Sequence, residues 1–264
     1  MHFTKMQGLG NDYLYVFGPP PEDVAALSVR LSERHFGPGA DGTIFIEPSD
    51  CADFRMRIFN ADGSEARMCG NGIRCVGKYV FDKGYTQKTA LTVETRSGIK
   101  TLELHLEAGK VRSVSVDMGR AAVSPERTLT LDGAALKCTP VDVGNPHAVV
   151  FTEDAEAVPL TVLGPQIERH AAFPGGVNAE FVQVIDPRTL RMRVWERGSG
   201  VTLACGTGSC ASVAAAAAKG LCAYDTPVTV RLDGGALTVT VSPDGALRMT
   251  GPAEFVYEGD TDIC

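Results

Sequence analysis

The sequence contains neither a long apolar run nor a dense run of basic residues. Its longest unbroken apolar stretch, residues 213–218, is far below the roughly 20 residues that cross a bilayer as a helix. Its first residues lack the apolar segment of a secretory signal peptide. With 25 Lys and Arg against 32 Asp and Glu, the net charge is -7, and no cationic cluster offers a footprint for a phosphate backbone. We therefore expect a cytoplasmic protein that binds neither membrane nor nucleic acid.

Cysteines at the short Cys-x-x-Cys spacing of zinc sites are also absent. Cys69 and Cys75, like Cys205 and Cys210, stand farther apart, and the second cysteine of each pair falls inside a predicted helix, so no metal site is expected. The eight cysteines are even in number, but a chain of 264 residues can form a core without disulfides. We expect free thiols and a reducing compartment.

One sequence device occurs twice. A strand-like run is followed by a turn and then by Cys-Gly-x-Gly at the start of a helix, with Cys69 and Cys205 lying 205 − 69 = 136 residues apart. Each helical stretch stops at Lys-Gly, where glycine is the usual residue just past a helix end. This repeat predicts two similar domains, residues 1–120 and 121–251, with a last strand in 252–264 completing the first domain and the active site in the cleft between them.

Most of the chain alternates apolar and polar residues in short runs broken by turns, which is typical of antiparallel strands. Strands are expected at 101–106, 111–118, 228–232, 236–241, 246–250 and 254–257, and helices at 21–34, 72–83, 162–170 and 208–219. The second and fourth helices are apolar nearly all round, which favours burial inside a sheet. The predicted fold is α+β, with two pseudo-symmetric domains that each wrap a mostly antiparallel curled sheet around a central helix.

The chemistry of a Cys-Gly-x-Gly turn is that of an anion receptor. Glycine lets the backbone approach a ligand, and the helix start directs N–H groups and a positive dipole end toward a carboxylate. The same dipole favours a thiolate. Two such turns around one carbon atom would let one sulfur remove an α-proton while the other delivers a proton to the opposite face, as racemisation or epimerisation requires, without a cofactor.

A single cysteine at a turn is more often structural than catalytic, but two copies in register favour function. A protein that uses the helix ends only to bind an amino acid, or that uses its thiols for redox chemistry, is the alternative from another class. Asn11, Asn145 and Asn178 stand near Gly or Pro and are also ordinary turn residues. Glu196 and Arg197 are alternatively a surface ion pair.

Several motifs together resemble the diaminopimelate epimerases, within the cofactor-independent racemase and epimerase family that includes proline racemase. The resemblance covers the whole chain and rests on the segments 10–12, 59–65, 68–75, 144–147, 177–178, 195–198 and 204–208. Asn71 favours the diaminopimelate branch, since proline racemases usually have His there. The resemblance implies an isomerase that interconverts LL- and meso-2,6-diaminopimelate for lysine and peptidoglycan synthesis, as a cytoplasmic homodimer without pyridoxal phosphate or metal.

The resemblance also implies a role for each matching residue. Cys69 and Cys205 form the acid/base pair. The reacting carboxylate is bound by Gly70, Asn71, Gly206 and Thr207. The rest of the substrate is held by Asn11, Asn60, Asn145, Asn178, Glu196 and Arg197. His147 either supports the site or is structural.

The pair Glu196 and Arg197 suits a substrate with a second ammonium and carboxylate. It therefore argues against the alternative substrates proline and hydroxyproline. One departure from the family concerns Gly42, where some members carry Gln, so a side-chain contact in the distal pocket is absent or is replaced by backbone.

Overall fold

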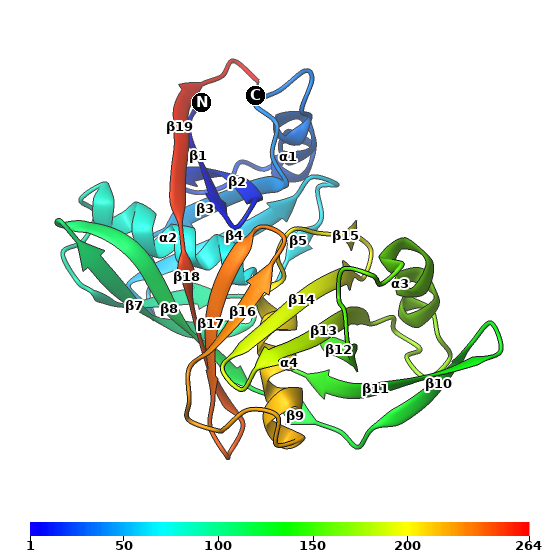
Figure 1. The fold of residues 1–264 in the computed structure, drawn as a ribbon. Coiled ribbons are helices and arrows are strands. Elements are labelled where there is room, and N and C mark those ends of the chain that lie inside the picture. The colour runs from blue at the N-terminus through cyan, green and yellow to red at the C-terminus, as the bar shows by residue number, and fades with distance from the viewer. Residues whose placement is uncertain (264) are drawn as a thin grey trace. The chain divides into compact units, whose positions relative to one another are not determined.

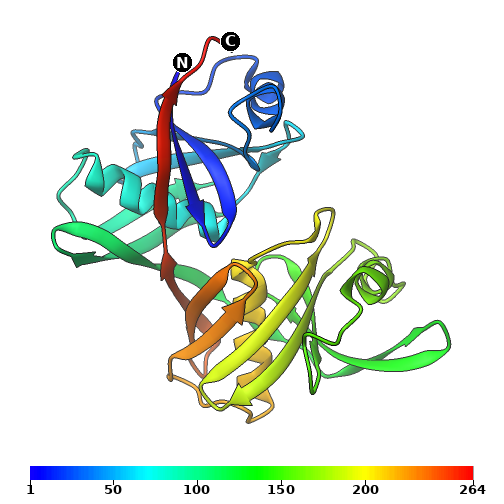
Figure 2. The ribbon, with the colours of Figure 1, turned by 45° about the horizontal axis from the view of Figure 1, so that its top comes forward.

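The computed structural model describes residues 1–263, and Figures 1 and 2 show its ribbon. The chain forms two units, one of Met1–Val116 with Gly251–Cys264 and the other of Asp117–Thr250. Cys264, the last residue of the predicted segment 252–264, lies outside the described residues. Two strands, β8 (Lys110–Arg120) and β18 (Ala246–Pro252), run across the unit boundaries.

The first unit combines a curled sheet with two helices. Its elements in chain order are β1 (His2–Gly8), β2 (Asn11–Phe17), α1 (Val24–Ser32), β3 (Gly42–Glu47), β4 (Phe54–Asn60), β5 (Glu65–Ala66), α2 (Gly70–Asp82), β6 (Ala90–Thr95), β7 (Gly98–Glu107) and, from the end of the chain, β19 (Glu254–Asp260). Strand β19 pairs antiparallel with β1, so that His2 faces Asp260. The chain end therefore completes the sheet of this unit.

The second unit repeats this plan. Its elements are β9 (Ala122–Val123), β10 (Arg127–Leu131), β11 (Ala134–Asp142), β12 (Pro146–Phe151), α3 (Leu160–Glu168), β13 (Asn178–Asp186), β14 (Thr189–Glu196), β15 (Gly200–Val201), α4 (Gly206–Ala218), β16 (Val228–Leu232) and β17 (Gly235–Val241). The helices expected from sequence are all present, and so are the predicted hairpin β7–β8, the meander β16–β18 and the last strand.

Strand pairing follows the same order in both units. Most pairs are antiparallel, but each unit has two parallel pairs joined across a helix: β2–β3 and β4–β6 in the first, and β12–β13 and β14–β16 in the second. A parallel pair needs a long crossover, which the intervening helix supplies. The predicted α+β fold with two pseudo-symmetric domains is confirmed.

The second helix of each unit is its buried centre. Every residue from 70 to 80 of α2 is buried, and 11 of the 13 residues of α4 are buried. Helix α4 contacts strands β9, β11 to β14, β16 and β17, and the strands curl around α2 and α4 in Figure 2. The all-round burial predicted from sequence is confirmed. Two cations are nevertheless buried in α2: Arg74 donates to the carbonyl oxygen of Gly70, and Lys78 to that of Val111.

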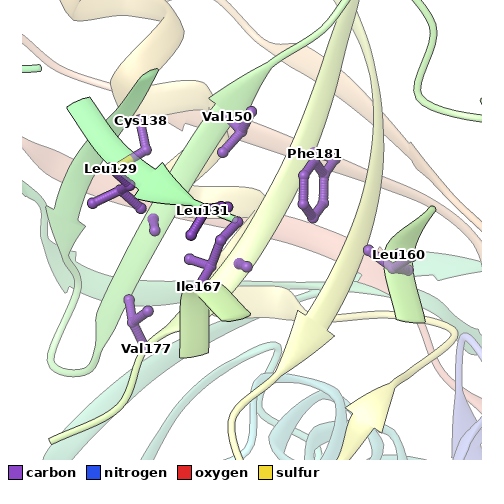
Figure 3. Packing of buried hydrophobic residues seen from close by; sticks show 10 residues of the cluster. Leu129, Leu131, Cys138, Val150, Leu160, Ile167, Val177 and Phe181 are labelled. Carbon is purple, nitrogen blue, oxygen red and sulfur yellow. The ribbon is translucent and has the colours of Figure 1, made fainter. Parts of the chain in front are cut away.

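A second core of the second unit lies on the outer side of its sheet, beneath α3. Figure 3 shows this cluster, which contains Leu129, Leu131, Cys138, Ala148, Val150, Leu160, Ile167, Val177, Ala179 and Phe181. Trp195 packs against it and lies so close to α3 that a Cβ at Gly164 would stand 2.4 Å from its ring. This packing fixes the start of β13 and the end of β14, where Asn178 and Glu196 stand.

Candidate active site

The cysteine of each Cys-Gly-x-Gly turn caps the helix that follows it. Cys69 and Cys205 have extended backbone conformations, and each sulfur accepts the N–H of the glycine three residues later, Gly72 or Gly208, at 3.3 Å. The helices begin at Gly70 and Gly206, two residues earlier than predicted, because the sulfur satisfies a first-turn N–H and lets the helix start directly after the cysteine. Both thiols therefore lie at the positive end of a buried helix.

In the first unit, Asn11 and Asn71 gather beside Cys69. The Sγ atom of Cys69 lies 3.4 Å from Oδ1 of Asn11, which also accepts from Nδ2 of Asn71 at 3.4 Å. Asn71 is held in turn by Arg74, whose Nη2 donates to its Oδ1 at 3.0 Å. The hydroxyl of Tyr13 also hydrogen-bonds Cys69. The first cluster thus surrounds its sulfur with amides, a phenol and a guanidinium.

In the second unit, a continuous line of polar groups leads to Cys205. Its Sγ lies 3.5 Å from Oγ1 of Thr207, which accepts from Nδ2 of Asn145 at 3.4 Å. Oδ1 of Asn145 lies 3.1 Å from Nε2 of His147, and Nδ1 of His147 lies 2.6 Å from Oε1 of Glu180. His147 is therefore part of the cluster, and it stands two groups away from the sulfur.

Asn11 and Asn145 occupy equivalent places in the two units. Leu14 pairs with Thr43 in the first unit, and Ala148 pairs with Ala179 in the second. Counting back three residues from Leu14 and Ala148 gives Asn11 and Asn145. By the same count Tyr13 corresponds to His147. Gly72, the third residue of α2, faces Ile44, whereas Gly208, the third residue of α4, faces Glu180. An apolar contact in one half is replaced by a carboxylate in the other.

Their surroundings give the two thiols different acidities. Burial raises the pKa of Cys69, but N–H groups of Gly72 and Asn71, the Tyr13 hydroxyl and the Arg74 charge all act to lower it. Burial also raises the pKa of Cys205, and here the charges of Glu196 and Glu180 raise it further, well above its ordinary value. Cys69 is thus the more acidic thiol, and Cys205 holds its proton more firmly.

Glu196, Arg197 and Asn178 meet at the end of β14. Burial raises the pKa of Glu196, which hydrogen-bonds the hydroxyl of Thr202 and the thiol of Cys205. Oδ1 of Asn178 accepts the backbone N–H of Arg197 at 2.8 Å. The guanidinium of Arg197 donates to the carbonyl oxygen of Gly175 at 2.9 Å. The acid and the guanidinium therefore have separate partners instead of forming a surface ion pair with each other.

Asn60 and Gly42 lie at the facing ends of β4 and β3. Nδ2 of Asn60 donates to Oγ of Ser64 at 3.0 Å, so its side chain braces the turn after β4. At Gly42 a Cβ would stand 2.2 Å from the carbonyl oxygen of Phe59. A side chain at residue 42 requires the backbone to move, which agrees with the expectation that no side-chain contact is made there.

Sequence reasoning did not single out Tyr13, Arg74, Asp41 or Glu180 as site residues. Asp41 accepts from Nδ2 of Asn11 at 2.7 Å. The signal for Glu180 was a lone carboxylate in an otherwise buried strand, since charged residues are rarely buried without a partner. Arg74 gave a similar signal within an apolar helix.

Comparison with known proteins decides the family. The family model described as diaminopimelate epimerase matches residues 3–124 and 139–256. A diaminopimelate epimerase from Acetivibrio thermocellus is 50% identical over 100% of this chain and 99% of its own. One from Methanococcus maripaludis is 48% identical over 100% of both chains. The chain belongs to the diaminopimelate epimerase family.

Membership of the diaminopimelate epimerase family makes the protein an isomerase of the epimerase class, as the sequence resemblance implied. The fold is shared more widely: the crystal structure of a hydroxyproline epimerase from Agrobacterium vitis has a TM-score of 0.77 at 19% identity, covering 98% of this chain and 91% of its own. Among the described residues, no helix is long and apolar enough to cross a membrane.

Proposed function

We propose that this protein interconverts LL- and meso-2,6-diaminopimelate by moving the α-proton between two cysteine sulfurs. The observation that carries the proposal is the pair of cysteine-capped helices, each with its sulfur 3.3 Å from a first-turn N–H, in a chain of this family. We propose further that Cys69 and Cys205 act on the two faces of one α-carbon. The products serve lysine and peptidoglycan synthesis.

The mechanism is a two-base proton transfer. One cysteine, as thiolate, takes the α-proton and becomes a thiol; the opposite cysteine, as thiol, gives its proton to the other face of the carbanion and becomes the thiolate. The next turnover in the reverse direction exchanges their roles. Because the pKa of Cys205 is raised further than that of Cys69, we propose that Cys69 is the thiol that gives up its proton more readily when the reaction begins.

The negative charge that develops on the substrate needs fixed donors. We propose that the first-turn residues Gly70 and Asn71, together with Gly206 and Thr207, bind the reacting carboxylate. First-turn N–H groups have no partner within a helix, and the helix dipole adds a positive field at the same place. Such preorganised donors stabilise the carbanion without a cofactor.

The distal half of diaminopimelate carries a second ammonium and a second carboxylate. We propose that Glu196 and Arg197 meet these two charges, and that the substrate is further held by Asn11, Asn60, Asn145 and Asn178. The support is local: Glu196 is half-buried and hydrogen-bonds the thiol of Cys205, and Asn178 accepts the backbone N–H of Arg197 at 2.8 Å. A fixed pair of opposite charges selects a substrate with two amino-acid groups.

The test is proton exchange with solvent. Reduced protein is incubated with LL-diaminopimelate in deuterated water beside Cys69→Ala and Cys205→Ala variants, and isomer composition and α-deuterium are followed by NMR. The expected result is meso product carrying one α-deuterium, and no conversion by either variant. Exchange with proline or hydroxyproline in place of diaminopimelate would overturn the substrate but keep the chemistry. Conversion that persists in a variant would overturn the two-base assignment.

We propose a homodimer as the working form. Outer strand β19 exposes Val256 at 52% and Tyr257 at 42%, and apolar side chains on an outer strand favour association. Sedimentation of the protein should give about twice the 28.0 kDa chain mass, and a Val256→Lys, Tyr257→Lys variant should sediment as a monomer. A wild-type monomer at micromolar concentration would contradict this.

We propose that the protein works in the cytoplasm and does not bind nucleic acid. The seven cysteines described in the structure are all free, and free thiols persist in a reducing compartment. The net charge of -7 disfavours a phosphate backbone. Cell fractionation should find the protein in the soluble cytoplasmic fraction; recovery from the cell envelope would contradict the assignment.

A further inference from the structure

Asn11 lies between an acidic side chain and the sulfur of Cys69. Its Nδ2 donates to Oδ2 of Asp41 at 2.7 Å, and its Oδ1 lies 3.4 Å from Sγ of Cys69. An ionised carboxylate only accepts hydrogen bonds. The amide nitrogen of Asn11 must therefore face Asp41, which leaves its carbonyl oxygen facing the thiol.

The groups on the other side demand the same orientation. The guanidinium of Arg74 only donates, so it fixes Oδ1 of Asn71 toward itself at 3.0 Å and turns Nδ2 of Asn71 toward Oδ1 of Asn11 at 3.4 Å. The hydrogen bonds thus run in one direction. They start at the Arg74 guanidinium, which only donates, and end at the Asp41 carboxylate, which only accepts. Turning over the amide of Asn11 alone would set donor against donor and acceptor against acceptor.

Asp41 is itself anchored away from the sulfur. Its Oδ2 accepts the backbone N–H of Asp12 at 3.1 Å, and its Oδ1 accepts from Nη2 of Arg34 at 2.9 Å. Its own backbone N–H donates to the carbonyl oxygen of Asp12 at 2.8 Å. Arg34 also holds the carboxylate of Asp12, at 2.8 Å. The Asp41 carboxylate is therefore set by the turn before β3, and the position of Asn11 follows from it.

We infer that Asp41 is a positioning residue for Cys69, which it controls by holding the carbonyl oxygen of Asn11 against the sulfur. The inference rests on the proposed acid/base role of Cys69. A carbonyl oxygen accepts from a thiol and repels a thiolate, so it opposes the helix dipole and the Gly72 N–H, which favour the thiolate. Asp41 thereby keeps Cys69 able to carry a proton, as it must when it acts as the acid.

Other charged and titratable groups also act on Cys69. They are Tyr13 and Tyr15 from β2, and Arg74 and Cys75 from α2. Tyr13 is also linked to the proposed positioning pair, since the Asp41 charge raises the pKa of Tyr13 and its hydroxyl hydrogen-bonds Asn11. A substitution at residue 41 therefore acts on the sulfur in two ways: through loss of the Asp41 charge, which Tyr13 also feels, and through release of Asn11.

The experiment is Asp41→Asn, read by the pH dependence of Cys69 alkylation with iodoacetamide and peptide mass mapping. An amide at residue 41 carries no charge and has an NH2 group in place of one carboxylate oxygen, so it no longer fixes the carbonyl oxygen of Asn11 against the sulfur. We expect alkylation at pH values below the thiol pKa to quicken about tenfold, equivalent to one pKa unit. Asn11→Ala, which removes the acceptor, is expected to quicken it in the same direction. An unchanged profile in both variants would overturn the inference.

Two further variants separate positioning from charge. Asp12→Asn removes a negative charge and its ion pairs with Arg34 and Lys5 but leaves the hydrogen bond between Asn11 and Asp41, so its profile should stay near that of the wild type. Asp41→Asn added to Asn11→Ala should have no further effect. If the second substitution quickens alkylation equally in both backgrounds, Asp41 acts through its charge alone and the inference is wrong. Alkylation needs no substrate, so this result is independent of the solvent-deuterium test.

Discussion

Nδ1 of His147 lies 2.6 Å from Oε1 of Glu180, and both side chains are completely buried. The other carboxylate oxygen, Oε2, has no hydrogen-bond partner among the described residues. A buried carboxylate with one partner is costly unless it has a role, because burial penalises its charge. Here the carboxylate fixes a proton on Nδ1 of His147 and keeps a negative charge near Cys205.

Glu180→Gln should therefore make Cys205 a stronger acid and slow epimerisation. Removing the negative charge lowers the pKa of Cys205, so its thiolate forms at lower pH, and the histidine loses a charged partner. We expect kcat to fall about 10- to 100-fold, the worth of one hydrogen bond to a charged group. The measurement is the pH profile of Cys205 alkylation beside steady-state rates. An unaltered alkylation profile would show that Glu180 is only structural.

The two thiols should titrate in a fixed order. Both pKa values are raised by burial, but only Cys205 is raised further by nearby carboxylates. As pH rises, the thiolate of Cys69 should appear first, so iodoacetamide should label Cys69 before Cys205. Time-resolved peptide mapping checks this, with Cys69→Ser and Cys205→Ser as single-thiol references. Labelling of Cys205 first would contradict the assignment.

Loss of either cysteine should abolish activity without unfolding the protein. Each sulfur caps a helix, and loss of a cap costs about 0.5 to 2 kcal/mol. We expect Cys69→Ala and Cys205→Ala to lower the free energy of unfolding by no more than this amount in urea titrations, while turnover falls at least about 100-fold, as expected for an acid/base group. Inactivity of an unfolded variant would say nothing about catalysis, so the urea unfolding curve of each variant is the required control.

Gly72 and Gly208, the third residues of α2 and α4, should differ in how well they tolerate substitution by alanine. A Cβ at Gly72 would stand 2.7 Å from Cδ1 of Ile44, a flexible end that can move. A Cβ at Gly208 would stand 2.8 Å from Oε1 of Glu180, which His147 holds in place. We expect Gly208→Ala to cost about 1 to 3 kcal/mol, as overpacking does, and Gly72→Ala clearly less. Equal urea midpoints would contradict this.

Stability should fall at alkaline pH partly because of Cys75. Burial raises its pKa from 9.0 to about 11, so the unfolded chain ionises first. The contribution is complete below pH 9, where it amounts to about 2 to 3 kcal/mol, and it is lost as pH rises through about 11. Urea unfolding of wild type and Cys75→Ala across this range should show a steeper decline in the wild type. Parallel declines would contradict the assignment.

The sequence by itself determined the repeated plan of this protein. Cys-Gly-x-Gly is a local signal: the cysteine caps the helix and the glycines let it start, whatever the rest of the chain does. Nearly apolar stretches of helical length and alternating strands likewise predicted the buried α2 and α4 and the sheets around them, since hydrophobic period is read over a few residues. The starts of α2 and α4 were predicted two residues too late, because the sulfur cap lets each helix begin directly after its cysteine.

Only the tertiary structure decided which side chains surround each sulfur. Alternation along a strand tells which residues face inward, but not which neighbour they meet across the unit. Asn11 and Asn145 are equivalent although they lie 145 − 11 = 134 residues apart, two fewer than the cysteines, so a fixed repeat length does not align them. Strand pairing, a contact between distant segments, brings Asp41 to Asn11 and Glu180 to His147, and these contacts make two similar halves chemically unequal.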